Sequence, residues 1–393
     1  MAVNDVHKLN LECITAGGDA LGRLEGKPVF IEMGAPDETI ICRITEDRGT
    51  WARAELLEIV EPSPVRADAV CAFYGKCGGC NLQHIDYKAQ IAAKVFILKD
   101  SFSRIGGINV PEIEVFACAP YGYRNRMQFH CLRQKAKSEH DLKFGLMGRR
   151  SGEIAAVSDC PVAVQPIREI LQGKGKSITL PPEKDRFSVF CKDDVFLSEG
   201  ARQRGKIKLL DKEIQADAGV FFQSNCAMLE KLILELQKIA ENTDHSLPMA
   251  DLYSGAGTFA LFLGGMYPKV ILAEENKTSV SLARENLRGI NAEFFALRDT
   301  DWQKTLFRGA GAFGFMVVDP PRAGLAPKLV SALCERHTAA LAYVSCDPSS
   351  LARDSKTLMK GGYKLKALKL FDFYPQTAHI ESLAVFEMNT DTL

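Results

Sequence analysis

Asp251-Leu-Tyr-Ser-Gly-Ala-Gly257-Thr258 lies between a short apolar run and a segment with helical periodicity, and this alternation continues toward the end of the chain. Strands that alternate with helices of roughly 10 to 15 residues predict a doubly wound, mainly parallel sheet. Its strands are expected at Met249–Tyr253, Val270–Glu274, Glu293–Leu297, Phe315–Asp319, Ala340–Ser345, Leu365–Phe371 and Ile380–Met388. Its helices are expected from Thr258 and over Ser279–Ile290, Pro327–Arg336 and Leu351–Gly361.

The glycine turn is a candidate ligand site. Gly255 and Gly257 let the backbone pass close to a ligand at the amino end of a helix. Glu274 ends the next strand, where an acidic residue can hold a ribose diol, although Glu275 could take that position instead. No third glycine follows at residue 260, which argues against a dinucleotide and favours one adenosine moiety, such as that of S-adenosylmethionine. A tight turn beside a solvated acid is the structural alternative.

Three further motifs fall at strand ends, where such sheets bind ligands. They are Asp319-Pro-Pro-Arg322, Ser345-Cys346-Asp347-Pro348 and His379-Ile-Glu381-Ser382. A cysteine is more often a small core residue than a nucleophile. Cys346 differs because Asp-Pro-Ser-Ser follows it and caps a new helix, whose dipole is expected to favour the thiolate.

A cysteine and a carboxylate at one nucleotide site suit methylation of a pyrimidine carbon. Carbon 5 of uracil is a poor nucleophile until a thiolate adds to carbon 6. The proton at carbon 5 must leave before the thiolate does, so a general base is required. The Asp-Pro-Pro turn also occurs in enzymes that methylate exocyclic amines, but there an aromatic residue usually follows, whereas Arg322 follows here.

The rest of the chain predicts additional domains, because 393 residues are too many for one core. Short strands between turn signals from Leu9 to Ile59 predict a small barrel, and Pro62-Ser-Pro64 reads as a linker. No apolar run approaches the roughly 20 residues of a membrane span. Residues 1–10 lack the features of a signal peptide, so we expect a cytoplasmic protein with no membrane partner.

Charge is uneven although the net charge is zero. Residues 1–65 carry 6 Lys/Arg against 12 Asp/Glu, a net of −6, and residues 121–150 carry 8 against 2, a net of +6. A second basic stretch runs from Arg202 to Lys212. Such stretches are either solvated faces or RNA contacts. Cations and aromatics mix in Tyr123-Arg-Asn-Arg126, Phe129 and Arg149-Arg150, as in proteins that bind folded RNA.

Three of the 12 cysteines form a tight cluster, with five residues between Cys71 and Cys77 and two between Cys77 and Cys80. Disulfides are not expected in the cytoplasm. A redox Cys-x-x-Cys pair is one interpretation, although no βαβ context surrounds it. A zinc site with His84 as the fourth ligand is another.

Taken together, the motifs resemble the RNA uridine-5-methyltransferase family, which has bacterial 23S ribosomal RNA and tRNA members. The matching segments follow the family's order and cover nearly the whole chain: Phe222-Gln-Ser-Asn225, Asp251 to Gly257, Asp319-Pro-Pro-Arg-Ala-Gly324, Val344-Ser-Cys-Asp-Pro348 and His379-Ile-Glu-Ser382. The resemblance implies Cys346 as nucleophile and Glu381 as the base for carbon 5. It implies that S-adenosylmethionine is bound by Gln223, Tyr253, Gly255, Gly257, Thr258, Glu274 and Asp319.

The resemblance also implies a metal centre and a domain plan. Cys160 looks like a distant fourth ligand, so Cys71, Cys77, Cys80 and Cys160 would hold a 4Fe-4S cluster. The expected domains are an OB-like TRAM barrel (1–62), a central α+β iron–sulfur domain (63–82 and 115–215) and a Rossmann-like methyltransferase domain (83–114 and 216–393). We expect a monomer that methylates 23S ribosomal RNA. A tRNA methyltransferase and a non-catalytic iron–sulfur RNA-binding protein are the alternatives.

Overall fold

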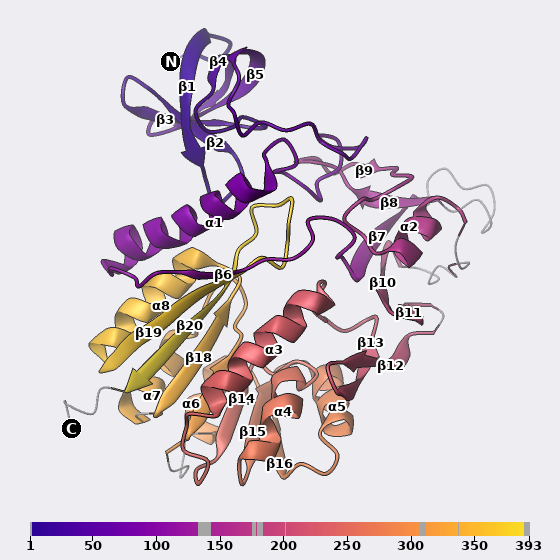
Figure 1. The fold of residues 1–393 in the computed structure, drawn as a ribbon, viewed down its shortest axis with the longest axis vertical. Helices are drawn as coiled ribbons and strands as arrows, with labels where there is room; N and C mark the ends of the chain where they lie inside the picture. The colour runs from indigo at the N-terminus through magenta and orange to yellow at the C-terminus, as the bar shows by residue number, and fades with distance from the viewer. Residues whose placement is uncertain are drawn as a thin grey trace.

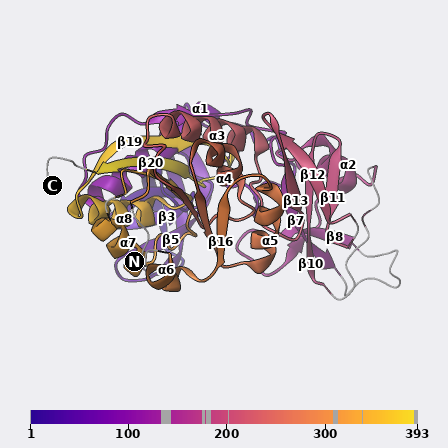
Figure 2. The same cartoon turned by 90° about the horizontal axis from the view of Figure 1, so that it is seen from below.

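The computed structural model describes residues 2–132, 143–174, 178, 184–200, 202–306, 312–336 and 338–388. In Figure 1 the N-terminal strands stand above a large sheet covered by helices, and a smaller sheet lies beside both. Figure 2, a view from below, shows the large helix-covered sheet and the smaller sheet lying side by side. In the described part of the chain, no helix has the length and apolar character needed to traverse a bilayer.

The N-terminal strands form the expected small barrel. They are β1 (Val6–Ile14), β2 (Ala20–Leu24), β3 (Lys27–Ile31), β4 (Thr39–Asp47) and β5 (Ala52–Glu61), closed in the order β1-β2-β3-β5-β4. Alternate residues of β4 point inward, so that Ile40, Cys42 and Ile44 are fully buried. The period-2 pattern in the sequence therefore predicted this fold correctly.

A second sheet is antiparallel and has the order β11-β10-β7-β8-β9. Phe129, Phe144 and Phe187 pack edge-on or tilted on one of its faces, with ring centroids 5.0 to 5.6 Å apart. Its elements are β7 (Arg126–Leu132), β8 (Lys143–Met147), β9 (Ile154–Ala155), β10 (Arg186–Lys192), β11 (Val195–Ser198) and α2 (Gln165–Leu171). A separate hairpin, β12 (Arg204–Leu209) and β13 (Lys212–Asp217), leads to the large sheet.

The large sheet has eight strands in the order β16-β15-β14-β17-β18-β20-β19-β6. The five strands from β16 to β18 are parallel, and β20 runs antiparallel between β18 and β19. The strands are β6 (Glu114–Phe116), β14 (Met249–Leu252), β15 (Val270–Glu274), β16 (Ala292–Ala296), β17 (Phe315–Val318), β18 (Ala340–Ser345), β19 (Tyr363–Phe371) and β20 (Glu381–Met388).

Helices cover both faces of this sheet, as expected for a doubly wound fold. Phe315 and Val317 of β17 belong to one hydrophobic core, and the alternate residues Met316 and Val318 belong to the other. One core includes residues of α3 (Cys226–Ala240), α4 (Thr258–Leu263) and α5 (Lys277–Asn286). The other includes residues of α1 (Tyr87–Ser101), α6 (Asp299–Thr305), α7 (Pro327–Arg336) and α8 (Pro348–Lys360). Short turns at Phe102–Gly106 and Gly264–Met266 extend α1 and α4.

The barrel docks on the rest of the molecule through ion pairs. Arg150 donates to both carboxylate oxygens of Asp19, at 2.8 and 2.7 Å, and also pairs with Glu32. Arg149 reaches Glu32 at 2.8 Å. The Asp19 side chain is only 4% exposed, so its charge is compensated mainly inside the protein. Part of the charge asymmetry in the sequence therefore reflects ion pairs between the acidic barrel and the basic stretch. Residues 133–142 of the basic stretch lie outside the described residues.

Candidate active site

The glycine turn after β14 has the backbone shape that its sequence predicts. Gly255 and Gly257 have φ values of +54° and +76°, and Tyr253, with φ of +60°, shares this left-handed region. A Cβ on Gly257 would lie 2.6 Å from a Leu287 methyl carbon, so the close approach of α5 also requires glycine here. The turn ends at the first residue of α4, Thr258.

Two carboxylates support this turn. Glu274, at the end of β15, accepts a hydrogen bond from the Gly255 N–H at 3.1 Å, whereas Glu275 is exposed. Asp251, the third residue of β14, accepts from the Ala260 N–H at 3.0 Å. Burial raises the pKa of Asp251 to about 8, and its other carboxylate oxygen has no partner among the described residues. Glu274, rather than Glu275, is therefore the acid directed at the turn.

A pocket opens beside the glycine turn. Its wall includes five of the seven predicted cofactor residues, while Gly257 and Glu274 lie next to residues of the wall. Burial raises the pKa of Asp319, at the end of β17, to about 7. The side-chain amide oxygen of Gln223 is buried without a partner among the described residues, so it is available to a ligand. The lining residues are Phe221, Phe222, Gln223, Leu229, Tyr253, Ser254, Gly255, Ala256, Thr258, Phe259 and Asp319.

Cys346 and Glu381 lie next to each other at the end of the sheet where the parallel strands terminate. Cys346 directly follows β18, and Glu381 begins the antiparallel strand β20. Ser345 pairs with Ser382, and the two site residues stand one position beyond that pair. Asp347 then caps α8 by accepting from the Ser350 N–H at 2.8 Å. The local motif therefore folds as expected, with the cysteine at a strand end and the helix after it.

The ionisation of Cys346 differs from the sequence-based expectation. Burial raises the pKa of the Cys346 thiol to about 12, and the neighbouring carboxylates of Glu381 and Asp319 add to the rise. Arg322 acts in the opposite direction. The prediction that the helix dipole would favour the thiolate is wrong for the free protein, because burial and two nearby acids outweigh it. Burial and Asp319 likewise raise the pKa of Glu381 well above its usual range.

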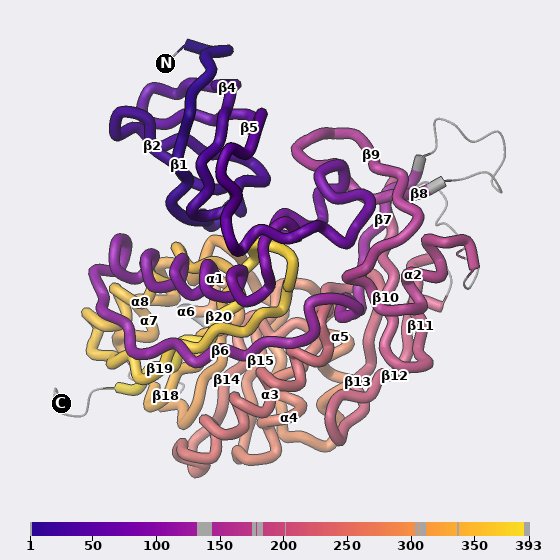
Figure 3. The backbone as a smooth tube through the Cα atoms, turned by 45° about the horizontal axis from the view of Figure 1, so that its top comes forward, coloured from indigo at the N-terminus to yellow at the C-terminus, as the bar shows by residue number. Residues whose placement is uncertain are grey.

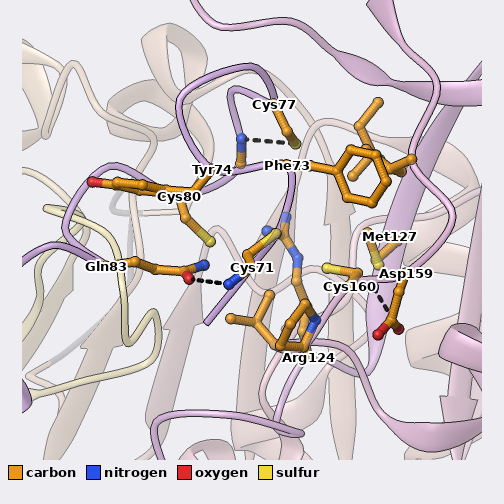
Figure 4. Close-up of a pocket in the computed structure, with 15 residues that line it drawn as sticks. Cys71, Phe73, Tyr74, Cys77, Cys80, Gln83, Arg124, Met127, Asp159 and Cys160 are labelled. Atoms are coloured by element: carbon orange, nitrogen blue, oxygen red, sulfur yellow. Dashed lines mark hydrogen bonds between the residues drawn. The ribbon is translucent and has the colours of Figure 1, made fainter. Parts of the chain in front are cut away.

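The four predicted metal cysteines all line the same pocket, which is separate from the one beside the glycine turn. Figure 4 shows the sulfur atoms of Cys71, Cys80 and Cys160 gathered in the same space, with Cys77 close by. In the described residues, however, no three His, Cys, Asp or Glu side chains already stand in a metal-binding arrangement. The pocket also has apolar walls, from residues that include Phe73, Met127, Leu146, Val157 and Val162.

His84 does not belong to this pocket. Its ring nitrogens contact the Tyr74 hydroxyl at 2.5 Å and the Gly34 carbonyl oxygen at 2.9 Å, and its side chain is buried against the barrel. Burial lowers the pKa of His84 to about 4, so the ring is neutral at pH 7. The zinc interpretation with His84 as fourth ligand is therefore wrong, because both of its nitrogens already have protein partners.

The suggested RNA-contact motif is largely interior. Phe129 is fully buried, Tyr123 donates to the Pro375 carbonyl oxygen at 2.9 Å, and Arg126 donates to Ser188 at 3.1 Å. Three arginines of the motif, Arg124, Arg149 and Arg150, line a groove, and Arg124 also lines the cysteine pocket beside it. In the second basic stretch, Arg204 pairs with Asp217 at 2.8 Å. The aromatic residues of the motif therefore serve packing, and these arginines are the part of it that reaches an open surface.

Sequence reasoning gave no role to Asp251, Gln90, Lys94 or Asn81. Asp251 had a local signal, because a charged residue inside a four-residue strand that is otherwise apolar must have a partner or an unusual pKa. The other three had none. They contact the segment before Glu381, which lies almost 300 residues later in the chain.

Known proteins match this chain along nearly its whole length. The family model described as tRNA (Uracil-5-)-methyltransferase matches residues 202–388. A Treponema denticola protein named as an uncharacterized RNA methyltransferase is 32% identical, with 93% of this chain and 95% of that protein covered. The 23S rRNA (uracil(1939)-C(5))-methyltransferase RlmD of Pseudomonas putida is 30% identical, with 98% of this chain and 94% of that protein covered.

A solved structure shares the fold. The Pyrococcus abyssi tRNA (uracil-54, C5)-methyltransferase, in complex with S-adenosyl-L-homocysteine, superposes with a TM-score of 0.71 at 23% identity. The match covers 97% of this chain and 100% of that one. The full-length relatives, the family model and the arrangement of strand-end motifs agree, and the chain belongs to the RNA uracil-5-methyltransferase family.

Proposed function

We propose that this enzyme methylates carbon 5 of a uridine in 23S ribosomal RNA through a covalent bond between Cys346 and the uracil. The observation that carries the proposal is the position of Cys346 and Glu381. Cys346 directly follows β18, Glu381 begins the neighbouring strand β20, and Asp319 lies close to both at the same end of the sheet. The ribosomal target rests on full-length relatives named as 23S rRNA methyltransferases.

The pocket beside the glycine turn is the proposed cofactor site. S-adenosylmethionine would supply an electrophilic methyl group there. Gln223 and Asp319 offer it polar side chains, and Gly255 leaves room for a ligand because nothing lies within 4 Å of where its Cβ would be. Glu274 holds the turn through the Gly255 N–H. The residues present therefore suit a nucleoside with a polar tail.

Cys346 and Glu381 divide the chemistry between them. The Cys346 thiol gives its proton to water as its sulfur bonds to carbon 6 of uracil. The electrons of the C5–C6 double bond move toward the C4 carbonyl oxygen, and the resulting enolate is nucleophilic at carbon 5. Carbon 5 then takes the methyl group, and Glu381 removes the proton that carbon 5 still carries. The electrons of that C–H bond restore the ring double bond, and the sulfur leaves. Because burial raises the pKa of the Cys346 thiol to about 12, loss of this proton is part of the reaction and does not precede it in the free protein.

We propose that Cys71, Cys77, Cys80 and Cys160 hold a 4Fe-4S cluster. Four thiols around one mostly apolar pocket suit that group, because thiolates bind iron and apolar walls shield a cluster. Uracil methylation requires no electron, so we assign the cluster a structural role. Iron and sulfide analysis of anaerobically purified protein tests this assignment, with Cys160→Ala as the matched variant; about four irons per chain are expected.

We further propose that RNA approaches along a groove next to the cysteine pocket. Its lining comes from the barrel, the cysteine segment and the strands β7 and β8, and the described lining contains no Asp or Glu. The residues are Gly17, Gly78, Gly79, Cys80, Asn81, Arg124, Met127, Gln128, His130, Leu146, Met147, Gly148, Arg149 and Arg150. We also propose that the first 62 residues are a TRAM domain, with 63–82 and 115–215 as the central domain and 83–114 and 216–393 as the methyltransferase domain. A cytoplasmic monomer stays a prediction.

A tRNA target is the second candidate, because the family model and the solved structure carry that description. Nucleoside mapping of ribosomal and transfer RNA from cells that lack the gene separates the two. Loss of 5-methyluridine from 23S RNA, restored by the wild-type chain and not by Cys346→Ala, is expected. Loss from tRNA alone would overturn the ribosomal assignment. No loss from either RNA would favour a non-catalytic RNA-binding protein.

A further inference from the structure

The loop before Glu381 makes most of its hydrogen bonds to distant parts of the chain, beside a few local ones around Thr377. It covers residues 372–380, joins β19 to β20, and appears in Figure 1 as the yellow loop that rises toward α1 and the barrel. The tube view in Figure 3 shows it crossing the same region beside α1. Phe371 pairs with Glu381, so the loop begins directly after the residue opposite the proposed base and ends directly before the base itself. A shift of the loop would therefore act on the first residue of β20.

Gln376, in the middle of the loop, has a backbone conformation that other contacts must maintain. Its φ is +68°, in the left-handed region that non-glycine residues rarely occupy. Its carbonyl oxygen accepts hydrogen bonds from the N–H groups of Asn81 and Leu82, both at 3.1 Å. Its N–H and side chain bond to Gln90 of α1, at 2.9 and 3.0 Å. Such strain persists only where the surroundings fix it, as they do here.

Asn81 joins this loop to two other parts of the molecule. Its side-chain oxygen accepts from the Ala378 N–H at 2.9 Å, three residues before Glu381. Its side-chain nitrogen donates to the Gly17 carbonyl oxygen of the barrel at 3.1 Å. Asn81 directly follows Cys80, which lines the cysteine pocket. One residue thus connects the barrel, the cysteine segment and the loop that leads to the base.

We propose that Asn81 is a positioning residue for Glu381, and that the four-cysteine pocket controls its placement through Cys80. The proposal rests on the proposed function, since it assigns Glu381 as the base and the pocket as the cluster site. A base removes a proton efficiently only within hydrogen-bond reach of it, so a small shift of the loop slows that step selectively. Cys346 itself directly follows β18 and lies outside the loop, so the contacts of Asn81 are to the segment that leads to Glu381.

The first experiment compares Asn81→Ala with Asn81→Asp in the full chain, using substrate RNA and S-adenosylmethionine. Alanine removes the acceptor for the Ala378 N–H, whereas aspartate keeps the acceptor, loses the donor to Gly17 and adds a negative charge. We expect Asn81→Ala to lower kcat by about tenfold to about a hundredfold. The fraction of protein trapped on RNA as a denaturant-stable adduct should rise at the same time. Because Asn81 also lines the proposed RNA groove, the added charge of Asn81→Asp should raise the KM for RNA, so the two variants are compared at saturating RNA. There Asn81→Asp should restore kcat to within about threefold of the wild-type value and bring the adduct back to the wild-type level.

A general structural defect would give a different result. If Asn81→Ala merely destabilised the protein, adduct and turnover would fall together, and that outcome overturns the proposal. An equal loss of turnover in both variants also overturns it, because it would assign the effect to the barrel contact. Glu381→Gln is run in parallel. If that variant traps an adduct and Asn81→Ala does not, the positioning role fails alone; if Glu381→Gln traps none, the proposed mechanism fails.

The link to the cysteine pocket has a readout that does not depend on activity. Hydrogen exchange of the peptide that contains Ala378 is measured in wild-type protein before and after iron removal, and in Asn81→Ala. We expect at least about tenfold faster exchange without iron, and no further acceleration by iron removal in Asn81→Ala. Unchanged exchange at this peptide after iron removal would overturn the coupling.

Discussion

Cys346 and Glu381 lie on adjacent antiparallel strands, each directly next to one member of the Ser345–Ser382 pair. This relationship places a thiol and a carboxyl group at one end of the sheet. Burial raises the pKa of both groups, and the Asp319 carboxylate adds to the rise in each case. The Cys346 thiol, with its pKa of about 12, is therefore neutral in the free protein at pH 7.

Cys346→Ala should abolish methyl transfer and leave cofactor affinity within about twofold of wild type, because the thiol bonds only to the uracil. Radioactive methyl transfer to RNA measures the first quantity, and calorimetric titration with S-adenosylmethionine measures the second. Cys334→Ala is the matched control. Cys334 lies within α7, outside the proposed site, so this variant should remain active. Measurable turnover by Cys346→Ala would refute covalent catalysis.

The raised pKa of Cys346, about 12, predicts slow alkylation by iodoacetamide at pH 7. Only the thiolate reacts, and its fraction grows about tenfold per pH unit below the pKa. Mass spectrometry of the peptide that contains Cys346 follows the rate from pH 7 to pH 10. Arg322→Gln should slow the reaction, because Arg322 lowers this pKa. A rate that levels off near pH 7 would mean that the thiol is already ionised.

Much of the large sheet could be predicted from the sequence. Strands such as β15 and β18 are continuous apolar runs, since both faces of a parallel sheet are buried, and their ends are marked by the first polar residue. The site motifs lie at those ends because the chemistry uses the side chains that the sheet presents there. The position of Cys346 followed from this rule.

The ionisation and the long-range contacts could not be predicted in the same way. The pKa of Cys346 depends on Glu381 and Asp319, which other strands bring to it, whereas the dipole argument considered only its own helix. The ion pairs of Arg149 and Arg150 could not be foreseen, because their partners, Glu32 and Asp19, lie more than a hundred residues away in the sequence. Charge patterns along a chain do not reveal which charges meet.

Removal of one partner from the buried ion pair of Lys94 and Asp372 should lower the free energy of unfolding substantially. Both side chains are fully buried, the charged atoms are 2.5 Å apart, and Tyr87 also donates to Asp372 at 2.8 Å. Lys94→Met leaves a buried carboxylate without its cation and should cost about 3 to 5 kcal/mol in the free energy of unfolding. Chemical denaturation measures it. The double variant Lys94→Met/Asp372→Leu should recover part of the loss; a double variant as unstable as the single one would argue against an isolated charge as the cause.

Arg150→Ala should loosen the barrel, because Asp19, whose side chain is 4% exposed, loses its partner outside the barrel and keeps only Arg53 of β5, at 2.7 Å, among its ion pairs in the described residues. Each partly exposed pair contributes about 0.2 to 1 kcal/mol, so the expected result is partial undocking rather than unfolding. Limited proteolysis near Pro62 to Pro64 should accelerate, and more strongly at low salt, where the wild-type ion pairs are strongest. Lys206→Ala, whose pair with Glu213 is exposed on a hairpin, is the control. Equal proteolysis of wild type and Arg150→Ala would show that other contacts hold the barrel.

Glu381→Gln should trap the enzyme on its RNA after methyl transfer. The amide cannot take the proton from carbon 5, so the ring double bond does not reform and the Cys346 sulfur does not leave. Denaturing gel electrophoresis should show a stable RNA–protein band that carries radioactivity from the methyl group, with turnover reduced at least about a hundredfold. Ser382→Ala, at the next position of β20, tests whether a change in the strand alone traps the complex, and should give no band. A labelled band that is absent from Glu381→Gln, while the unmethylated adduct accumulates, would instead assign Glu381 to a step before methyl transfer.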